Sequence, residues 1–207
     1  MTVKFMPFTP YHFGPNGFVG LLFRRWFDVP VFIAANVLVD IEVIADHFLQ
    51  PGWPVHQIWH FHTLLVGGFA GAIFGAIVYY IKPFRWLSEK SMALIGLPAK
   101  TTLLSMVLAG VLGVWLHVLI DSFYHYDIQI FWPHKDNTIF RWINSGKMSN
   151  MEKTQQWVVF YCKLFWGLML GLYGVLLALR AYPNNRDVMR QSEKSEAKAA
   201  GTKSPQA

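Results

Sequence analysis

The sequence predicts an all-α fold, a polytopic transmembrane bundle of four long apolar helices preceded by a short N-terminal helix. Of the 207 residues, 54% are hydrophobic and only 14% are charged, and the mean hydropathy is +0.31. Several apolar runs approach the roughly 20 residues that a helix needs to cross a bilayer. Basic residues are also shared unevenly among the connecting segments, as is typical of membrane proteins.

Five apolar segments form the expected helices. The first is short, and the other four each have about the length of a membrane span. The second segment would be as apolar as the others without its acidic residues Asp40, Glu42 and Asp46. In chain order the segments are residues 17–27, 31–49, 63–81, 101–124 and 157–181.

We expect two parts in the chain. Residues 1–182 form one integral membrane domain. Residues 183–207 are rich in Lys, Glu, Ser and Ala and lack apolar periodicity, so they are expected to be a disordered tail. The long connection over residues 127–156 carries several aromatic residues and is expected to cover the mouth of the bundle.

The charges predict an orientation, provided that the first segment crosses the bilayer. Twelve of the eighteen Lys and Arg residues then lie on one side, which the positive-inside bias makes cytoplasmic together with the tail. The net charge of +6 therefore indicates contact with the inner leaflet and not with nucleic acid. The twelve are Arg24, Arg25, Lys82, Arg85, Lys90, Lys100, Arg180, Arg186, Arg190, Lys194, Lys198 and Lys203.

A metal site is predicted first by His117, Asp121 and His125. These residues are spaced four apart, so on a helix they fall within an arc of roughly 80°. Imidazole nitrogens and carboxylate oxygens are the usual ligands of zinc and similar ions. Polar groups at the end of an apolar helix are costly, which makes them functional candidates.

All eight histidines fall on the outward face of the expected bundle, together with several carboxylates. In an up-down bundle, alternate helix starts and ends meet on one face, so residues distant in sequence can build one metal cage. His12 belongs to this set if the Pro- and Gly-rich turn around it folds back onto the mouth. His47 and His134 are expected to be solvated at the interface.

The second segment leaves two interpretations open. On a regular helix Asp40 and Glu42 point about 200° apart. Either the helix unwinds near Asp40, so that both acids turn inward, or one acid is structural. Asp40 is the favoured ligand because it follows the apolar residues of NVLVD and so lies deeper in the segment than Glu42. An acidic side chain at greater depth in the membrane costs more free energy.

Four motifs resemble the bacterial membrane-bound metal-dependent hydrolases, a family of small polytopic proteins. They are MPFTPYHFGP, ANVLVDIE, HFHT and LHVLIDSFYHYDIQIFWP, and the resemblance covers about residues 6–133. It implies a helical membrane bundle with metal residues at helix ends. The residues that it points to are His12, Asp40, Glu42, a histidine before Thr63, His117 and Asp121.

The histidine motif before Thr63 offers three choices. His62 matches the His-Thr pair, and its companion is either His56 or His60, with at most two of the three binding metal. The ligands predicted from residues and resemblance together are His12, Asp40, Glu42, His60, His62, His117, Asp121 and His125.

The expected function is metal-dependent hydrolysis of a phosphoester in a lipid or envelope substrate, at the outer membrane face. One to three divalent ions, zinc above all, are expected as cofactors. The His-Asp-His pattern is also similar at the site level to zinc phospholipase C and P1 nuclease. Asp40 and Glu42 are the catalytic candidates: Asp40 bridges two ions, and Glu42 is a ligand or the general base.

Two other classes stay open. Intramembrane acids and histidines also line ion pathways, so the chain could be a metal or proton transporter. That class predicts polar residues through the depth of several helices, whereas the segments GGFAGAIFGAIVYY and LLSMVLAGVLGVW are apolar. The second class is a membrane protein with a metal-stapled outer face and no turnover.

Overall fold

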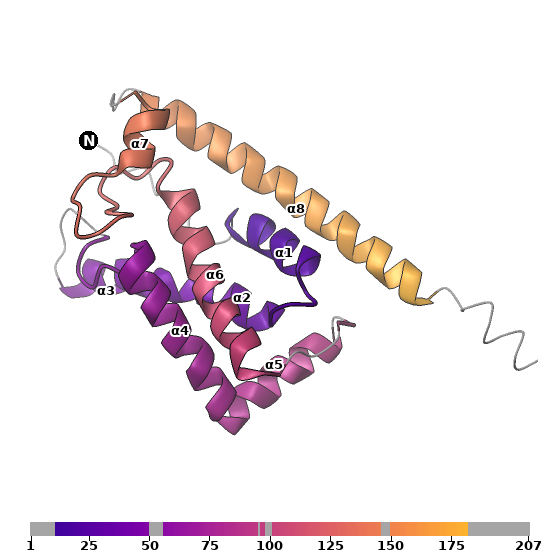
Figure 1. Cartoon of the computed structure of the whole chain (residues 1–207). Helices are drawn as coiled ribbons and strands as arrows, with labels where there is room; N and C mark the ends of the chain where they lie inside the picture. Colours follow the sequence, from indigo (N-terminus) through magenta and orange to yellow (C-terminus); the bar gives the residue numbers. More distant parts are fainter. Residues whose placement is uncertain (1–10, 50–55, 95, 98–100, 146–149, 182–207) are drawn as a thin grey trace, which may run out of the picture. The chain divides into compact units, whose positions relative to one another are not determined.

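The computed structural model describes residues 11–49, 56–94, 96–97, 101–145 and 150–181, with all side chains in these ranges except those of Asp46, His47 and Ala181. The predicted tail, residues 183–207, lies outside the described residues. Every regular element in the described ranges is a helix (Figure 1). In chain order the helices are α1 (Phe13–Leu22), α2 (Val29–Val39), α3 (Ile41–Leu49), α4 (Leu64–Tyr80), α5 (Lys82–Leu94), α6 (Leu103–Asp121), α7 (Thr138–Ile143) and α8 (Met151–Ala181).

The helix starts follow from capping residues in the sequence. The Asp28 carboxylate accepts a hydrogen bond from the Val31 backbone N–H at 3.0 Å and so caps α2. Thr63 caps α4 in the same way, and Thr102 caps α6 through a reciprocal capping box with Ser105. These caps fix where the apolar runs become helical.

The expected single helix over residues 31–49 is instead two helices. α2 ends at Val39, and the Asp40 N–H bonds to the Val37 carbonyl at 3.1 Å, the i−3 pattern of a tight turn. α3 then starts at Ile41. The interruption at Asp40 is the first of the two interpretations that the sequence left open.

α6 is the central helix, and it packs against both α4 and α2 (Figure 1). The α4–α6 contact is so close that a Cβ atom on Gly110 would collide with the Gly71 carbonyl oxygen, and one on Gly75 with the Met106 carbonyl oxygen. Glycine is needed here to let the two backbones approach, as at other helix interfaces in membranes.

The helices in the described residues that are long and apolar enough to cross a membrane are α6 and α8. A third span is possible only if α4 and α5 are taken together as a single span. The chain bends by 92° at the break between these two helices. Four spans were expected. α2 and α3 do not reach membrane length because the chain turns at Asp40 between them. α5 lies between the expected segments 63–81 and 101–124, where the sequence predicts a connecting loop and not a helix.

The chain divides into two compact units, residues 1–172 and 173–207, with the boundary inside α8. In the first unit, the core is built by α2, α4 and α6, with Phe32, Met106 and Val114 among its fully buried side chains. Along the described part of α8, Cys162 is the buried side chain and the others are exposed or half-buried. A helix that is apolar on all faces and little covered by protein is typical of a lipid-facing span.

Candidate metal centre

Four side chains converge at the C-terminal end of α6. Asp40, His62, His117 and Asp121 each offer one ligand atom, and these atoms all lie within 4.8 Å of one another. We call this set the four-residue centre. It arises because α4 runs antiparallel to α6, so that the loop before α4 meets the end of α6, while α2 ends beside the same turn.

The shortest approaches in the centre involve His117. Its Nε2 atom lies 3.0 Å from Asp121 Oδ2 and 3.3 Å from Asp40 Oδ1. His62 Nε2 points to the same carboxylate, 3.9 Å from Asp121 Oδ2, and has no hydrogen-bond partner among the described residues. The two imidazoles are fully buried, whereas the Asp40 side chain is 15% exposed. Asp40 therefore forms the accessible edge of the centre.

The outer nitrogens of both imidazoles are held by other residues. His62 Nδ1 lies 2.8 Å from Glu42 Oε2, and His117 Nδ1 lies 3.2 Å from His12 Nδ1. Metal-binding histidines commonly use their second nitrogen in this way, which fixes the ring and leaves the first nitrogen for the ion. Glu42 and His12 thus orient the two Nε2 atoms toward Asp121.

Glu42 was predicted as a ligand, but the structure engages both of its oxygens elsewhere. Oε1 accepts the Trp59 N–H at 2.6 Å, and Oε2 accepts the His62 N–H at 3.2 Å as well as contacting His62 Nδ1. The carboxylate is fully buried and ties the loop before α4 to α3. Glu42 thus lies behind His62 and outside the four-residue centre.

His12 was also predicted as a ligand, and it too lies beside the centre. Its Nε2 atom is 3.2 Å from Asp121 Oδ1, and its Nδ1 atom is the one that contacts His117. His12 is buried beside the centre as expected, but the expected turn is wrong: His12 immediately precedes α1, and the Pro- and Gly-rich residues 14–17 belong to that helix. Tyr124 completes this side by donating its hydroxyl to Asp121 Oδ1 at 2.8 Å.

His125 does not continue the row of His117 and Asp121. α6 ends at Asp121, and the turn that follows removes His125 from the helix face. His125 instead joins His56 and Asp127, whose ligand atoms lie within 4.8 Å of one another. We call these three buried residues the three-residue cluster. Asp127 was not among the predicted ligands; its position two residues after His125 was the available signal.

His60, a predicted ligand, lies in neither group. Its backbone has a φ of 55°, and its ring stacks on Trp132 with the ring centroids 5.3 Å apart. His56, the alternative companion of His62, packs against the His62 ring with the ring centroids 4.5 Å apart. Its ligand atom, however, belongs to the three-residue cluster. His134 is exposed, and the side chain of His47 lies outside the described residues.

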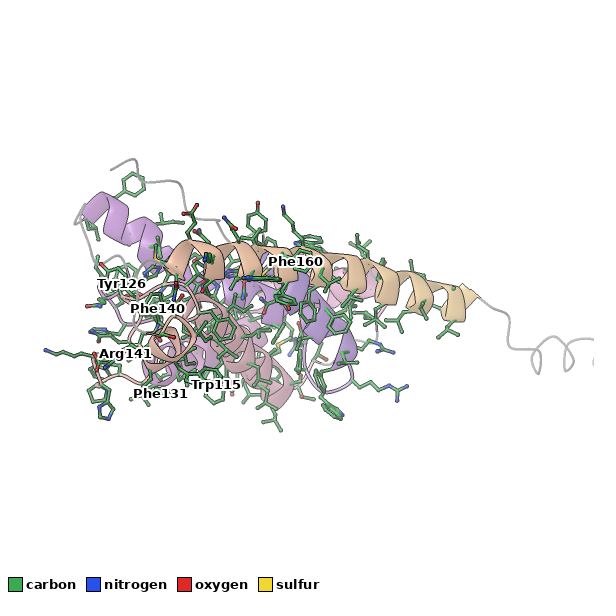
Figure 2. The ribbon with its side chains drawn as sticks, turned by 90° about the horizontal axis from the view of Figure 1, so that it is seen from above. Trp115, Tyr126, Phe131, Phe140, Arg141 and Phe160 are labelled. Atoms are coloured by element: carbon green, nitrogen blue, oxygen red, sulfur yellow. The ribbon has the colours of Figure 1, made fainter. Side chains whose placement is uncertain are left out.

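Figure 2 labels four residues of the segment after α6, namely Tyr126, Phe131, Phe140 and Arg141, which lie in the same part of the view. The rings of Tyr126 and Phe140 are 6.4 Å apart. Asn137 caps α7 through the Phe140 N–H and also donates to the Ser122 and His125 carbonyls. This segment therefore folds back onto the end of α6, as expected for a cover over the mouth of the bundle.

Burial and neighbouring charges shift the pKa values of the groups in the loops. Burial, together with the nearby His56 and His117, holds the pKa of His62 well below its usual range. Burial, followed by the repulsion of a nearby charge on His56, lowers the pKa of His125 to about 4. Both rings are therefore neutral near pH 7, the form in which imidazole binds metal.

The contact between the side chains of His56 and Asp127 decides the direction in which the pKa of each is shifted. Burial lowers the pKa of His56, but the hydrogen bond and charge of Asp127 outweigh this and raise it. Burial raises the pKa of Asp127, and the hydrogen bond from His56 outweighs that and lowers it. In the absence of an ion, His56 and Asp127 thus stabilise each other's charged forms, with 2.8 Å between Nδ1 and Oδ2.

The residues of the four-residue centre fit a divalent ion. Two imidazoles and two carboxylates are a donor set that zinc and related metals accept. The ion partners of Asp121 among the described residues are all histidines, so a dication would compensate buried negative charge that no Lys or Arg offsets. The structure thus offers buried His/Asp groups that can hold a metal ion, without fixing which metal.

Comparison of the chain with models of protein families, with curated proteins and with solved structures finds no match.

Proposed function

We propose that the chain is a membrane-embedded, metal-dependent hydrolase that acts on a phosphoester in a lipid or envelope substrate at the outer membrane face. The observation that carries the proposal is the four-residue centre, in which two fully buried imidazoles and a buried carboxylate meet a partly exposed one. A purely structural staple has no need of an exposed edge, whereas an enzyme needs one for its substrate.

The proposed roles follow from the contacts. His62, His117, Asp121 and Asp40 hold the ion. Asp40 is also the proposed general base, because it is the member of the centre with exposed surface. A bound divalent ion would supply a water of lowered pKa and stabilise charge that develops on the phosphoryl group.

Glu42 and His12 are positioning residues in this proposal. Glu42 holds His62 from behind, and His12 holds His117 and Asp121. Losing such partners weakens metal binding without removing a ligand. Their contribution to the reaction is therefore indirect.

We further propose that the chain crosses the membrane several times and that the four-residue centre faces outward. The candidate spans are α6, α8 and the α4–α5 pair, and the direction rests on the positive-inside bias of the basic residues. α6 carries His117 and Asp121 in its last two turns, so a span formed by α6 would have the centre near one membrane surface. Placing Arg85 and Lys90 of α5 on the cytoplasmic side puts that surface on the outside. A substrate at that depth would come from the lipid headgroup region or the envelope.

A metal or proton transporter is the second candidate, because polar side chains continue below the centre. Asn36 lies one helical turn before Asp40, and Asn16 one turn after His12. Both are fully buried, and neither Asn36 side-chain atom has a hydrogen-bond partner among the described residues. Opposing this candidate, the buried positions of α4 are mainly glycines and an aliphatic residue, without ionisable groups.

The test uses purified full-length protein in detergent, loaded with zinc. We expect hydrolysis of bis(p-nitrophenyl) phosphate by the wild type, loss to background in His117→Ala/Asp121→Ala, and full retention in His134→Ala, an exposed histidine. Equal rates in wild type and double variant would reject the hydrolase. Zinc uptake into proteoliposomes without hydrolysis would establish the transporter instead.

A further inference from the structure

We propose that His56, His125 and Asp127 form a second cation site beside the four-residue centre, suited to a divalent ion of the zinc type. The inference concerns metal binding by a separate set of side chains. It goes beyond the proposed function because it does not depend on hydrolysis.

The three-residue cluster has the composition and burial of a ligand set. Each residue is at least 94% buried, and its three ligand atoms lie within 4.8 Å of one another. The His56 and His125 rings are 4.5 Å apart, and His56 Nδ1 is 2.8 Å from Asp127 Oδ2. Two imidazoles and a carboxylate are the three protein ligands of many catalytic zinc sites, which keep further positions for water or substrate.

Two polar atoms of the cluster are left without a partner. His125 Nδ1 and Asp127 Oδ1 are both buried, and neither has a hydrogen bond within the described residues. Buried polar atoms are nearly always paired, so each unpaired atom needs an explanation. One ion bound between them would satisfy both atoms at once.

The backbone that carries the cluster is held by side chains. Asn137 Nδ2 donates to the His125 carbonyl at 2.7 Å, and Gln57 Nε2 donates to the Asp127 carbonyl at 2.7 Å. His56 precedes Gln57, so one contact also ties the two segments of the cluster together. These bonds fix positions that lie outside any helix, which is what a preorganised site requires.

The cluster adjoins the four-residue centre through His62. The His62 ring packs edge-on against His56 with centroids 4.5 Å apart, and against His117 with centroids 5.4 Å apart. Two ions held this way would be neighbours, as in hydrolases that use two metals. The competing explanation is that His56 and Asp127 form only a structural ion pair, with no ion.

The test is the zinc content of purified protein after dialysis against a zinc buffer, together with the visible spectrum of the cobalt-substituted protein. We expect about two equivalents in the wild type, about one in His125→Ala, and about one in His117→Ala/Asp121→Ala. His60→Ala, in neither group, should keep both. His125→Ala and the double variant should lose different cobalt bands.

The outcomes separate the two sites. One equivalent in the wild type, unchanged in His125→Ala and lost in His117→Ala/Asp121→Ala, would reject the second site and leave the four-residue centre intact. If His125→Ala fails to fold, His125→Gln decides, since it keeps a similar volume but lacks an imidazole: unchanged zinc in that variant rejects the site. One equivalent of zinc in the wild type that is lost in His125→Ala and kept in His117→Ala/Asp121→Ala would instead support the three-residue cluster and reject the four-residue centre.

Discussion

At the scale of single residues, the carboxylates that share a sequence motif have different tasks. Asp40 stands at the accessible edge of the four-residue centre, while Glu42 is fully buried behind His62. Glu42 already receives two backbone N–H groups and contacts His62 Nδ1. A carboxylate saturated in this way has little capacity left for an ion.

Asp40→Asn should leave the protein folded in the membrane but remove a metal equivalent and nearly all hydrolytic activity. The amide keeps the volume of the side chain and removes the charge that attracts the ion. Metal analysis and thermal unfolding of the purified variant check this. The control is Asp136→Asn, an exposed carboxylate paired with Arg141, which should change neither. Asp46→Asn, at a position whose side chain lies outside the described residues, should also be much milder than Asp40→Asn.

Glu42→Gln should weaken metal binding by about 10- to 100-fold without lowering the stoichiometry at saturating zinc, because His62 loses its anionic partner but remains a ligand. Competition with a chromogenic chelator measures the affinity. A drop in stoichiometry at saturation would instead make Glu42 a ligand, as the sequence predicted. Thermal unfolding of the same sample confirms that the fold is kept.

At the scale of helices, the α4–α6 contact positions the metal residues. Glycines on both helices let the backbones touch, and this contact sets the start of α4 against the end of α6. The hydrogen bond from Trp115 Nε1 to the Leu64 carbonyl, at 2.8 Å, fixes the same register. His62 reaches the centre because it precedes α4 by one residue, Thr63.

Gly110→Ala should destabilise the protein by about 1–3 kcal/mol, the usual cost of an added atom in a packed interface. The new Cβ would meet the Gly71 carbonyl oxygen, a backbone atom that cannot rotate away. Thermal or denaturant unfolding in detergent measures the effect. The matched control is Gly171→Ala in α8, where no atom lies within 4 Å of the added Cβ. Equal stability of the two variants would show that α4 and α6 are not in contact.

At the scale of the whole molecule, the proposed membrane topology states on which side of the bilayer each segment between the helices lies. α8 exposes most of its described length, including Phe160, Leu164 and Leu168, as expected for a helix in lipid. α5 is charged, follows the bend after α4 and would lie along the cytoplasmic surface. The segment after α6 would then lie outside.

Single cysteines placed in a Cys162→Ser background should map this orientation. Lys90→Cys and Lys198→Cys should react with an impermeant maleimide only from the cytoplasmic side, and Asp136→Cys only from the outside. Lys90 and Asp136 are exposed, so access is not limited by packing. Labelling of Lys198→Cys and Asp136→Cys from the same side would contradict the proposed topology.

The sequence by itself determined the helical class and the apolar segments, and its predicted ligands include all four residues of the four-residue centre. Hydropathy and charge are local properties, so the helices α4, α6 and α8 follow closely from the apolar runs. The spacing of His117 and Asp121 on one helix face is equally local. The sequence left open whether the helix is interrupted near Asp40 or one of the two acids is structural; the helix is interrupted there, and Glu42 supports His62 from outside the centre.

Only the tertiary structure decided how the polar residues divide into groups. Spacing along a helix predicted that His125 stays with Asp121, but α6 ends at Asp121 and the turn carries His125 to His56 and Asp127. Whether Glu42 and His12 bind an ion or support a ligand depends on donors from distant segments, which no local pattern records. The number of spans likewise depends on where the chain bends: the turn at Asp40 divides one apolar run into two short helices, and α4 makes a candidate span only together with α5, which follows the bend after it.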